Sequence, residues 1–263
     1  MIPDYSVIVP VHNGEKYIIE TLSSIDNQSD TPFEIIVVDD CSIDSTSSLV
    51  RNFAAYSNSP IKLIQLDTNS GSAAKPRNKG LEAVSDVKYV AFCDADDIWH
   101  IDKMSMQLKF MEQEKSMFSF GKVKCFNESS EISYQKLSLS IRGLNLKDFR
   151  FNNCIKSCST AVIDRAIMQY CKFPESIRYR GIEDYYCWLG ILSKVDGVDM
   201  IISELTFYRQ HEASISSSKV NMIKLRYDTF GFKKNIFEAN SVYLPNIFIS
   251  EIIYILKQLI SKL

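Results

Sequence analysis

Clusters of acidic side chains follow two β-rich apolar runs of the sequence. Two aspartates follow the run 33–38 and three follow the run 89–93, namely Asp39, Asp40, Asp94, Asp96 and Asp97. In open parallel sheets, ligands bind beyond the carboxyl ends of the strands, so side chains at these positions reach a substrate. Asp94 and Asp96, two residues apart on an extended chain, are expected to point to the same side and face one divalent cation. Mg²⁺ and Mn²⁺ suit such a site, because they take few carboxylates and keep waters and substrate phosphates as further ligands.

Helix capping is the alternative role for these aspartates. A single Asp after a strand often caps the helix that follows. Several carboxylates on neighbouring strand ends repel one another unless a cation compensates their charge, which favours a ligand site over capping.

A helix start with small residues and cations lies between the two acidic clusters. The segment 71–80 carries Lys75, Arg77 and Lys79. Backbone N–H groups at a helix start and the fork-shaped guanidinium of Arg77 suit a diphosphate. A solvated basic helix face is the alternative, and Lys79 is assigned to it.

Two further polar segments lie late in the chain. Glu183 and Asp184 precede an aromatic helical stretch, where they either cap the helix or act in chemistry. Tyr208 to His211 follow a short apolar run. The residue types alone leave the role of both segments open.

Strand and helix patterns alternate over the first hundred residues. Strands are predicted over 6–9, 33–38, 61–66 and 89–93, and helices over 18–25, 45–56 and 73–84. Runs that are apolar throughout are typical of strands covered on both faces, and the alternation implies right-handed crossovers in a mainly parallel sheet. We therefore expect an α/β fold whose open sheet is flanked by helices.

The pattern changes after Trp99. A helix around Met104 to Met111 and a β-rich run from Met117 to Phe126 lack a helix-and-strand repeat. We expect residues 1–97 to form a nucleotide-binding half and 98–216 a mixed α+β half of the same domain. Residues 217–263 are expected to form a helical extension.

Composition excludes several classes of protein. The 263 residues include 30 basic and 32 acidic side chains, a net charge of −2 that gives no reason to expect a nucleic-acid partner. The 7 cysteines are scattered and odd in number, as expected of reduced thiols in a cytoplasmic protein, and the 3 histidines do not form a zinc pattern with them. No signal peptide is visible, and no uncharged run approaches the ~20 residues that span a bilayer.

Six segments resemble, in order and spacing, the motifs of the family 2 glycosyltransferases. They are residues 6–13, 36–44, 77–80, 91–99, 181–185 and 208–216. The resemblance implies a GT-A fold and inverting transfer of a sugar from a nucleotide-diphosphate donor, such as a UDP-sugar, to an acceptor hydroxyl. The acceptor class implied is a carbohydrate or a lipid-linked saccharide in cell-surface polysaccharide or glycolipid synthesis.

The resemblance also implies a role for each matched residue. The nucleotide or donor sugar is expected at Pro10, Val11, Asn13, Glu15, Asp39, Asp40, Arg77, Asp94, Ala95 and Asp97. Asp40 is expected to accept a hydrogen bond from the base. Asp96 is the implied principal ligand of Mn²⁺ or Mg²⁺, with His211 over the metal or the diphosphate. Asp184 is the implied catalytic base and Glu183 its competitor.

Three positions depart from the usual motifs. His12 replaces the commoner Tyr, Cys41 stands where Gly is frequent, and Pro76 stands where Ala is usual. These changes alter the expected shape of the loops near the nucleotide without removing a catalytic group.

Two other functions remain to be tested against this one. A sugar-phosphate nucleotidyltransferase would want a glycine-rich phosphate loop after the first strand, which residues 10–14 do not provide. A non-catalytic module that binds nucleotide sugars is the second alternative, and the presence of Asp94, Asp96, Glu183 and Asp184 together argues against it.

The C-terminal segment is basic and amphipathic. Residues 219–263 carry 7 basic and 3 acidic side chains, and 245–263 place an apolar stripe on one side of a predicted helix. The stripe either packs against this domain or a second copy, or rests on an anionic bilayer where a lipid-linked acceptor lies. The second alternative predicts a protein at the cytoplasmic face of the membrane.

Overall fold

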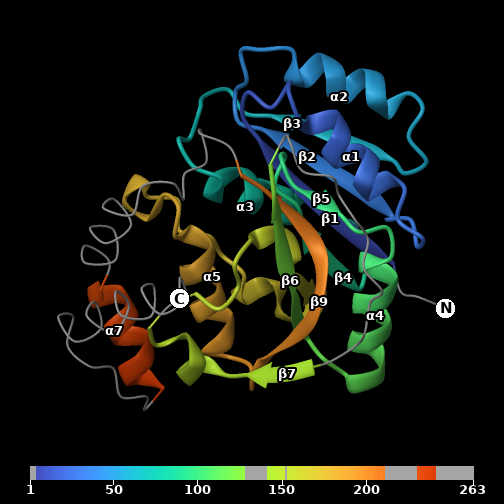
Figure 1. Cartoon of the computed structure of the whole chain (residues 1–263). Helices are drawn as coiled ribbons and strands as arrows, with labels where there is room; N and C mark the ends of the chain where they lie inside the picture. Colours follow the sequence, from blue (N-terminus) through green and yellow to red (C-terminus); the bar gives the residue numbers. More distant parts are fainter. Residues whose placement is uncertain (1–3, 128–140, 152, 211–229, 241–263) are drawn as a thin grey trace.

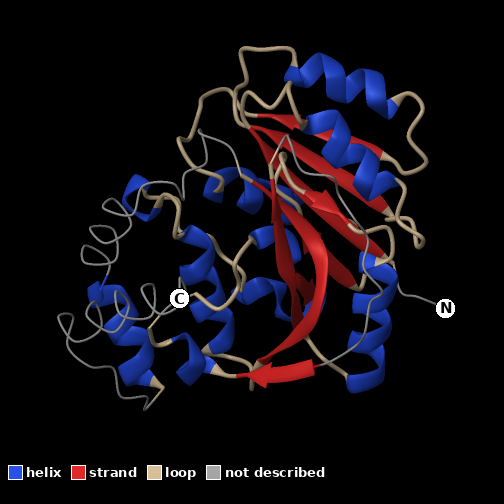
Figure 2. Ribbon diagram, viewed as in Figure 1, coloured by secondary structure: helices blue, strands red, loops and turns tan. Residues whose placement is uncertain are grey.

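One mixed sheet runs through the part of the chain that the structure, a computed structural model, describes: residues 4–127, 141–151, 153–210 and 230–240 (Figure 1). Within these residues the order of its strands is β3-β2-β1-β4-β8-β6-β9-β5, and β7 pairs with β9. Helices lie on both sides of the sheet (Figure 2). The fold is the expected mixed α/β arrangement.

The first part of the sheet is parallel. Its strands are β1 (Tyr5–Val11), β2 (Glu34–Asp39), β3 (Ile61–Gln65) and β4 (Tyr89–Phe92). The connecting helices are α1 (Ile18–Asp26), α2 (Thr46–Ala54) and α3 (Ala74–Ala83). β1 pairs in parallel with both β2 and β4, and β2 pairs in parallel with β3. The strands and helices predicted for this part of the chain are confirmed, and each end differs by at most two residues.

Alternate side chains of β1 enter two different cores, which explains why this strand is apolar throughout. Val7 and Val9 pack in one core with Leu22 of α1, whereas Ile8 packs in the other with Leu81 of α3. Every residue of β1 is buried. Because both faces are covered, the apolar residues show no alternation with polar ones.

The sheet continues past residue 97 with both strand directions. The further strands are β5 (Ile98–Trp99), β6 (Phe118–Phe126), β7 (Ile141–Leu144), β8 (Val162–Asp164) and β9 (Val198–Arg209). β8 is antiparallel to β4 and β6, whereas β6 and β9 are parallel. The expected mixed character of this part is confirmed, while the division of the chain at residues 97 and 216 stays a proposal.

The second part contains α-helices and short 3-10 helices. They are α4 (Lys103–Glu114), η1 (Leu146–Phe149), η2 (Cys158–Thr160), η3 (Arg165–Tyr170), η4 (Ile177–Tyr179), α5 (Glu183–Leu192) and α7 (Phe230–Ala239). α4 packs in the same core as α1. Trp188 of α5 is fully buried, with its ring centroid 5.2 Å from that of Phe118 and 5.7 Å from that of Phe173. This packing fixes α5, whose first two residues are Glu183 and Asp184.

Several further expectations are settled here. All 7 cysteines of the sequence are free thiols, as predicted. No helix among the described residues is long and apolar enough to cross a bilayer. The amphipathic helix predicted over 245–263 lies outside the described residues, so its packing or membrane contact stays a prediction.

Candidate active site

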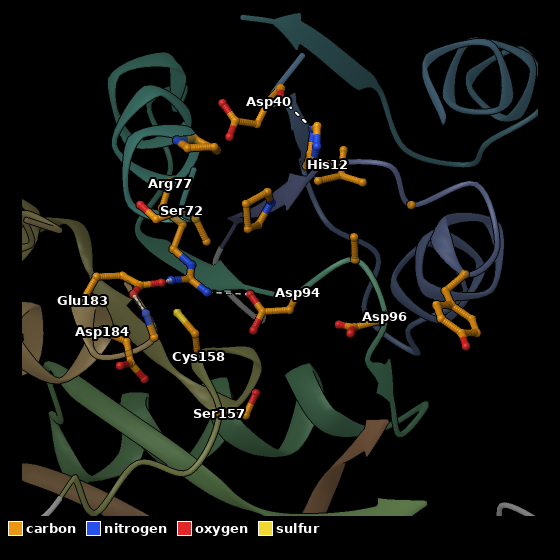
Figure 3. A pocket seen from close by; sticks show the side chains of 18 of the residues that line it. His12, Asp40, Ser72, Arg77, Asp94, Asp96, Ser157, Cys158, Glu183 and Asp184 are labelled. Carbon is orange, nitrogen blue, oxygen red and sulfur yellow. Dashed lines mark hydrogen bonds and ion pairs between the residues drawn. The ribbon is translucent and has the colours of Figure 1, made fainter. Parts of the chain in front are cut away.

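A cleft of about 1280 Å³ opens where the two parts of the chain meet (Figure 3). Ten of the side chains predicted for the site line it: Pro10, Val11, Asn13, Asp40, Arg77, Asp94, Ala95, Asp96, Glu183 and Asp184. They come from the ends of β1, β2 and β4 and from the starts of α3 and α5. Segments far apart in the sequence therefore converge on one site.

Asp40 lies at one end of this cleft, held by a loop. Ser70 donates to its carboxylate from the backbone N, at 2.9 and 3.0 Å to the two oxygens, and from Oγ at 2.8 Å. Nδ1 of His12 lies 2.9 Å from the backbone oxygen of Asp40, an interaction drawn in Figure 3. His12 thus replaces the usual Tyr with a side chain that ties β1 to the end of β2.

The turn after β2 explains one departure from the family pattern. Cys41 has a φ of 60°, in the left-handed region that favours glycine. A non-glycine residue costs about 1–2 kcal/mol there. The backbone therefore adopts the usual turn even though Gly is replaced.

Three of the predicted donor-binding residues, Glu15, Asp39 and Asp97, lie outside the cleft lining. Asp39 is fully buried and accepts hydrogen bonds from the backbone N of Ser42, at 2.9 Å, and from the hydroxyl of Ser47. Glu15 accepts a hydrogen bond from the backbone N of Ser45 at 3.0 Å. The carboxylates of Asp39 and Glu15 thus hold the loop after β2 and the start of α2, and their direct contact with the nucleotide stays a prediction.

Asp97 is also a structural anchor. Its carboxylate is fully buried and accepts hydrogen bonds from Ser157 Oγ at 3.0 Å, Ser159 Oγ at 2.6 Å and the backbone N of Arg209 at 3.1 Å. Burial, reinforced by the charges of Asp96 and Asp94, raises its pKa well above the usual range. Asp97 therefore joins the turn after β4 to the loop before β8 and to the end of β9, and it does not line the cleft.

Asp94 and Asp96 lie in a turn after β4. The backbone N of Asp97 donates to the oxygen of Asp94 at 3.1 Å, so the segment is a turn and not the extended chain assumed from the sequence. Asp94 faces Arg77, and Asp96 lies apart from it (Figure 3). That both carboxylates face one cation stays a prediction.

Arg77 joins the two sides of the cleft. Its side chain is 5% exposed and pairs with Asp94 at 2.7 Å and with Glu183 at 3.2 Å. Its guanidinium also lies over the ring of Phe173, 5.3 Å from the centroid. The two terminal nitrogens of Arg77, expected to meet a diphosphate, are thus bound to carboxylates, while Lys79 pairs with Glu82 on the exposed helix face as predicted.

Glu183 and Asp184 have different surroundings although they are adjacent. Glu183 is bound to Arg77 through Oε1, and Oε2 accepts from the backbone N of Gly181 at 2.6 Å. Asp184 has no ion-pair partner among the residues that the structure describes, and burial followed by the charge of Glu183 raises its pKa to about 7. A carboxylate with this pKa is suited to accept a proton near neutral pH.

A cation site is only partly defined by the described residues. No group of three His, Cys, Asp or Glu side chains in that part of the chain could hold a metal ion. The carboxylate of Asp96 lines the cleft, and its backbone oxygen accepts from Nε of Arg209 at 2.8 Å. One hard oxygen ligand fits a cation that takes its other ligands from phosphates and water. His211, the second predicted ligand, lies outside the described residues.

Sequence reasoning missed the loop that faces Asp184. Asn153 donates from Nδ2 to Oδ2 of Asp184 at 3.1 Å, and Lys156 and Ser157 line the cleft. Arg180 lines it too, directly before Gly181. These residues carry no motif and no regular spacing, so their only signal is the tertiary structure.

Comparison with known proteins gives a consistent result. The family described as Glycosyl transferase family 2 matches residues 6–171. The UDP-Glc:alpha-D-GlcNAc-diphosphoundecaprenol beta-1,3-glucosyltransferase WfgD of Escherichia coli is 33% identical over 239 residues, which are 86% of this chain and 85% of that protein. The putative teichuronic acid biosynthesis glycosyltransferase TuaG of Bacillus subtilis is 36% identical over 220 residues, 82% of this chain and 83% of that one.

A solved structure shares the fold. The mannosyltransferase PcManGT of Pyrobaculum calidifontis, solved in complex with GDP-Man and Mn²⁺, aligns with a TM-score of 0.68 at 19% identity. The alignment covers 89% of this chain but only 65% of the solved one. At this identity the likeness concerns the fold alone.

Proposed function

This chain belongs to glycosyl transferase family 2, and on that basis we propose that it transfers a hexose from a UDP-sugar to a hydroxyl of a saccharide carried on a lipid diphosphate. The enzyme is an inverting glycosyltransferase with a GT-A fold that uses a nucleotide-diphosphate sugar donor. The relatives WfgD and TuaG support a place in cell-surface polysaccharide synthesis. The name of WfgD makes UDP-glucose the first donor to test.

The observation that carries the mechanism is the difference between the two adjacent carboxylates. Both carboxylates line the cleft, but Glu183 is ion-paired with the buried guanidinium of Arg77. Among the described residues the oxygens of Asp184 accept hydrogen bonds from neutral N–H donors, and burial raises its pKa to about 7. We assign the general base to Asp184 for this reason, and Glu183 to holding Arg77 in place.

The reaction follows from that assignment. The acceptor hydroxyl gives its proton to a carboxylate oxygen of Asp184 while its oxygen forms a bond to the anomeric carbon. The bond from that carbon to the diphosphate oxygen breaks, and UDP leaves with the electron pair. Attack on the face opposite UDP inverts the anomeric configuration. General-base assistance of this kind is typically worth about 10²–10⁴-fold in rate.

The donor occupies the end of the cleft formed by the parallel strands. Pro10, Val11 and Asn13 line that end together with Asp40, which we propose as the residue that meets the base. Asp96 is proposed to hold Mn²⁺ or Mg²⁺, with His211 as a further ligand. When bound, such a cation neutralises negative charge that develops on the leaving diphosphate.

Two positively charged side chains of the cleft favour an acceptor that carries phosphate. Lys156 and Arg180 line the cleft beside Asp184, and within the described ranges neither side chain has a hydrogen-bond or ion-pair partner. A diphosphate attached to the acceptor sugar supplies the missing negative charge. Because UDP-sugars are cytosolic and such an acceptor is held in a membrane, we place the reaction at the cytoplasmic face of that membrane.

Product formation tests the proposal. The enzyme is incubated with Mn²⁺, one of several UDP-sugars, and either GlcNAc-diphospholipid or the same glycolipid without phosphate. We expect UDP release and a disaccharide-diphospholipid with one donor, and at least tenfold slower reaction without the diphosphate. Release of pyrophosphate from UTP and a sugar phosphate, with no transfer from any UDP-sugar, would instead identify a nucleotidyltransferase. Binding of UDP-sugars without turnover on any acceptor would identify a binding module.

A further inference from the structure

The loop between η1 and η2 supplies a side chain to the carboxylate of Asp184. We propose that Asn153 is a positioning residue that fixes the orientation of Asp184 for proton transfer. The proposal rests on the proposed function, because it concerns the residue assigned there as the base.

The amide of Asn153 has one possible orientation. Its Oδ1 accepts a hydrogen bond from the backbone N of Ile155 at 3.0 Å, so its Nδ2 must face the other way. Nδ2 lies 3.1 Å from Oδ2 of Asp184. A flipped amide would bring its NH₂ group against the N–H of Ile155 and its oxygen against a carboxylate, which places like partial charges together at both ends.

Asp184 is consequently held at both oxygens. The backbone N of Tyr185 donates to Oδ1 at 2.6 Å while Asn153 donates to Oδ2. A carboxylate with one donor on each oxygen cannot rotate about its last bond without losing one of them. Each oxygen accepts more than one hydrogen bond, so capacity remains for a hydroxyl in the cleft.

The loop that carries Asn153 is itself braced from two directions. On one side the hydroxyl of Tyr185 in α5 donates to the backbone oxygen of Phe149. On the other side Ser157 and Ser159 donate to the buried carboxylate of Asp97. Asn153 therefore sits on a short span fixed between α5 and the turn after β4, which is the support a positioning residue requires.

Asn153 also acts on the charge of Asp184. Glu183 and Asp94 disfavour a second negative charge on Asp184, whereas Arg77 favours it. Lys156 and Arg180 line the same cleft, and the buried thiols of Cys158 and Cys187 interact with Asp184 with pKa values raised by burial, which keeps them neutral. A neutral N–H donor adds to the favourable side, because it binds the carboxylate more strongly than the acid. Removing Asn153 should raise the pH at which Asp184 loses its proton.

The test is the pH dependence of kcat in single variants of the full chain. Asn153→Ala removes the donor, and Asn153→Asp keeps the acceptor for Ile155 but turns a carboxylate oxygen toward Asp184. The acid limb is the part of the pH–rate profile in which kcat falls at low pH. We expect its midpoint to move up by about one pH unit in Asn153→Ala and further in Asn153→Asp. The constant kcat at high pH should be several-fold lower in both variants. The KM for the donor should stay unchanged, because neither variant alters the donor end of the cleft.

Asn145→Ala is the matched control. Asn145 caps η1 in the same segment, through a hydrogen bond from the backbone N of Lys147 at 2.9 Å, and it does not line the cleft. Its variant should share the acid limb of the wild-type enzyme. If Asn153→Ala does not fold, the near-isosteric Asn153→Asp decides the matter.

Two failures are distinguishable. Suppose that the acid limb disappears in Asp184→Asn, as expected of the base. If the Asn153 variants then keep the same acid limb as the wild-type enzyme, the positioning role alone is overturned. A wild-type enzyme that transfers no sugar would overturn the proposed function instead. One that transfers sugar at a rate that does not fall at low pH would overturn the assignment of Asp184 as the base, and the positioning role with it.

Discussion

A terminal nitrogen of Arg77 lies 3.2 Å from the carboxylate of Glu183, 106 residues further along the chain. This ion pair joins α3 to the start of α5, and the other terminal nitrogen of Arg77 binds Asp94. One buried guanidinium thus links the turn after β4 to the helix that carries Asp184. The geometry of the base depends on an interaction that contains no reacting atom.

Loss of Arg77 is predicted to destabilise the fold more than loss of Glu183. Arg77→Met leaves two carboxylates without their cation, whereas Glu183→Gln leaves Arg77 paired with Asp94. Breaking a buried pair by removing one partner costs about 3–5 kcal/mol of unfolding free energy. Urea denaturation of both variants measures the difference, and equal stabilities would contradict the bridging role of Arg77.

The rate of transfer is predicted to rise with pH through about 7. Asp184 must be deprotonated to accept a proton, and burial together with Glu183 raises its pKa from 3.8 to about 7. Below that value kcat falls about tenfold per pH unit, while above it the rate is constant. A pH–rate profile of wild-type enzyme checks this. A rate that is flat from pH 5 to pH 8 would contradict a titrating base in this environment.

Asp96 and Asp97 are predicted to differ although they are adjacent. Asp96→Ala should weaken UDP binding at least tenfold in the presence of Mn²⁺ and leave metal-free binding unchanged. Asp97→Ala should leave the Mn²⁺-dependent binding of UDP unchanged in the folded protein. It should lower the unfolding free energy by about 2–4 kcal/mol, because three buried donors lose their hydrogen-bond acceptor. Calorimetric titration and thermal unfolding measure the two effects. The reverse pattern would exchange the roles assigned here.

Gly80 is predicted to be essential for the close packing of α3 against β1. A Cβ at Gly80 would lie 2.4 Å from Cγ2 of Ile8, so Gly80→Ala should cost about 1–3 kcal/mol through overpacking. Gly190→Ala in α5 is the matched control, since the nearest atom to its Cβ is a backbone oxygen at 3.5 Å. That variant should be neutral or up to about 1 kcal/mol more stable. Equal unfolding free energies for the two variants would show that β1 and α3 do not approach this closely.

Local sequence signals predicted most of the fold. Predicted strand 33–38 is observed as Glu34–Asp39, and predicted helix 73–84 as Ala74–Ala83. Continuous apolar runs and helical periods report burial on one or both faces, and these patterns need only nearby residues. After residue 97 the sequence locates the helix around Met104 to Met111 and the β-rich run from Met117 to Phe126, which are observed as α4 and β6. Strands such as β8, with three residues, carry too little pattern to locate.

The candidate site was predicted in part for the same reason. Residues at strand ends, such as Asp40 and Asp96, reach the cleft because the ends of parallel strands meet at one edge. The partners of Arg77 and the position of Asn153 depend on contacts across tens of residues that leave no trace in local spacing. The turn at Asp94 likewise overrides the extended geometry on which the cation pair was predicted.

The turnover of Asp184→Asn tests the central claim most directly. The substitution keeps the size of the side chain at the start of α5 and removes the group that accepts the proton. With UDP-sugar and acceptor at saturation, we predict that kcat falls about 10²–10⁴-fold while the Kd for UDP stays at its wild-type value. A variant that turns over within a few-fold of the wild-type rate would contradict the assignment of Asp184 as the base.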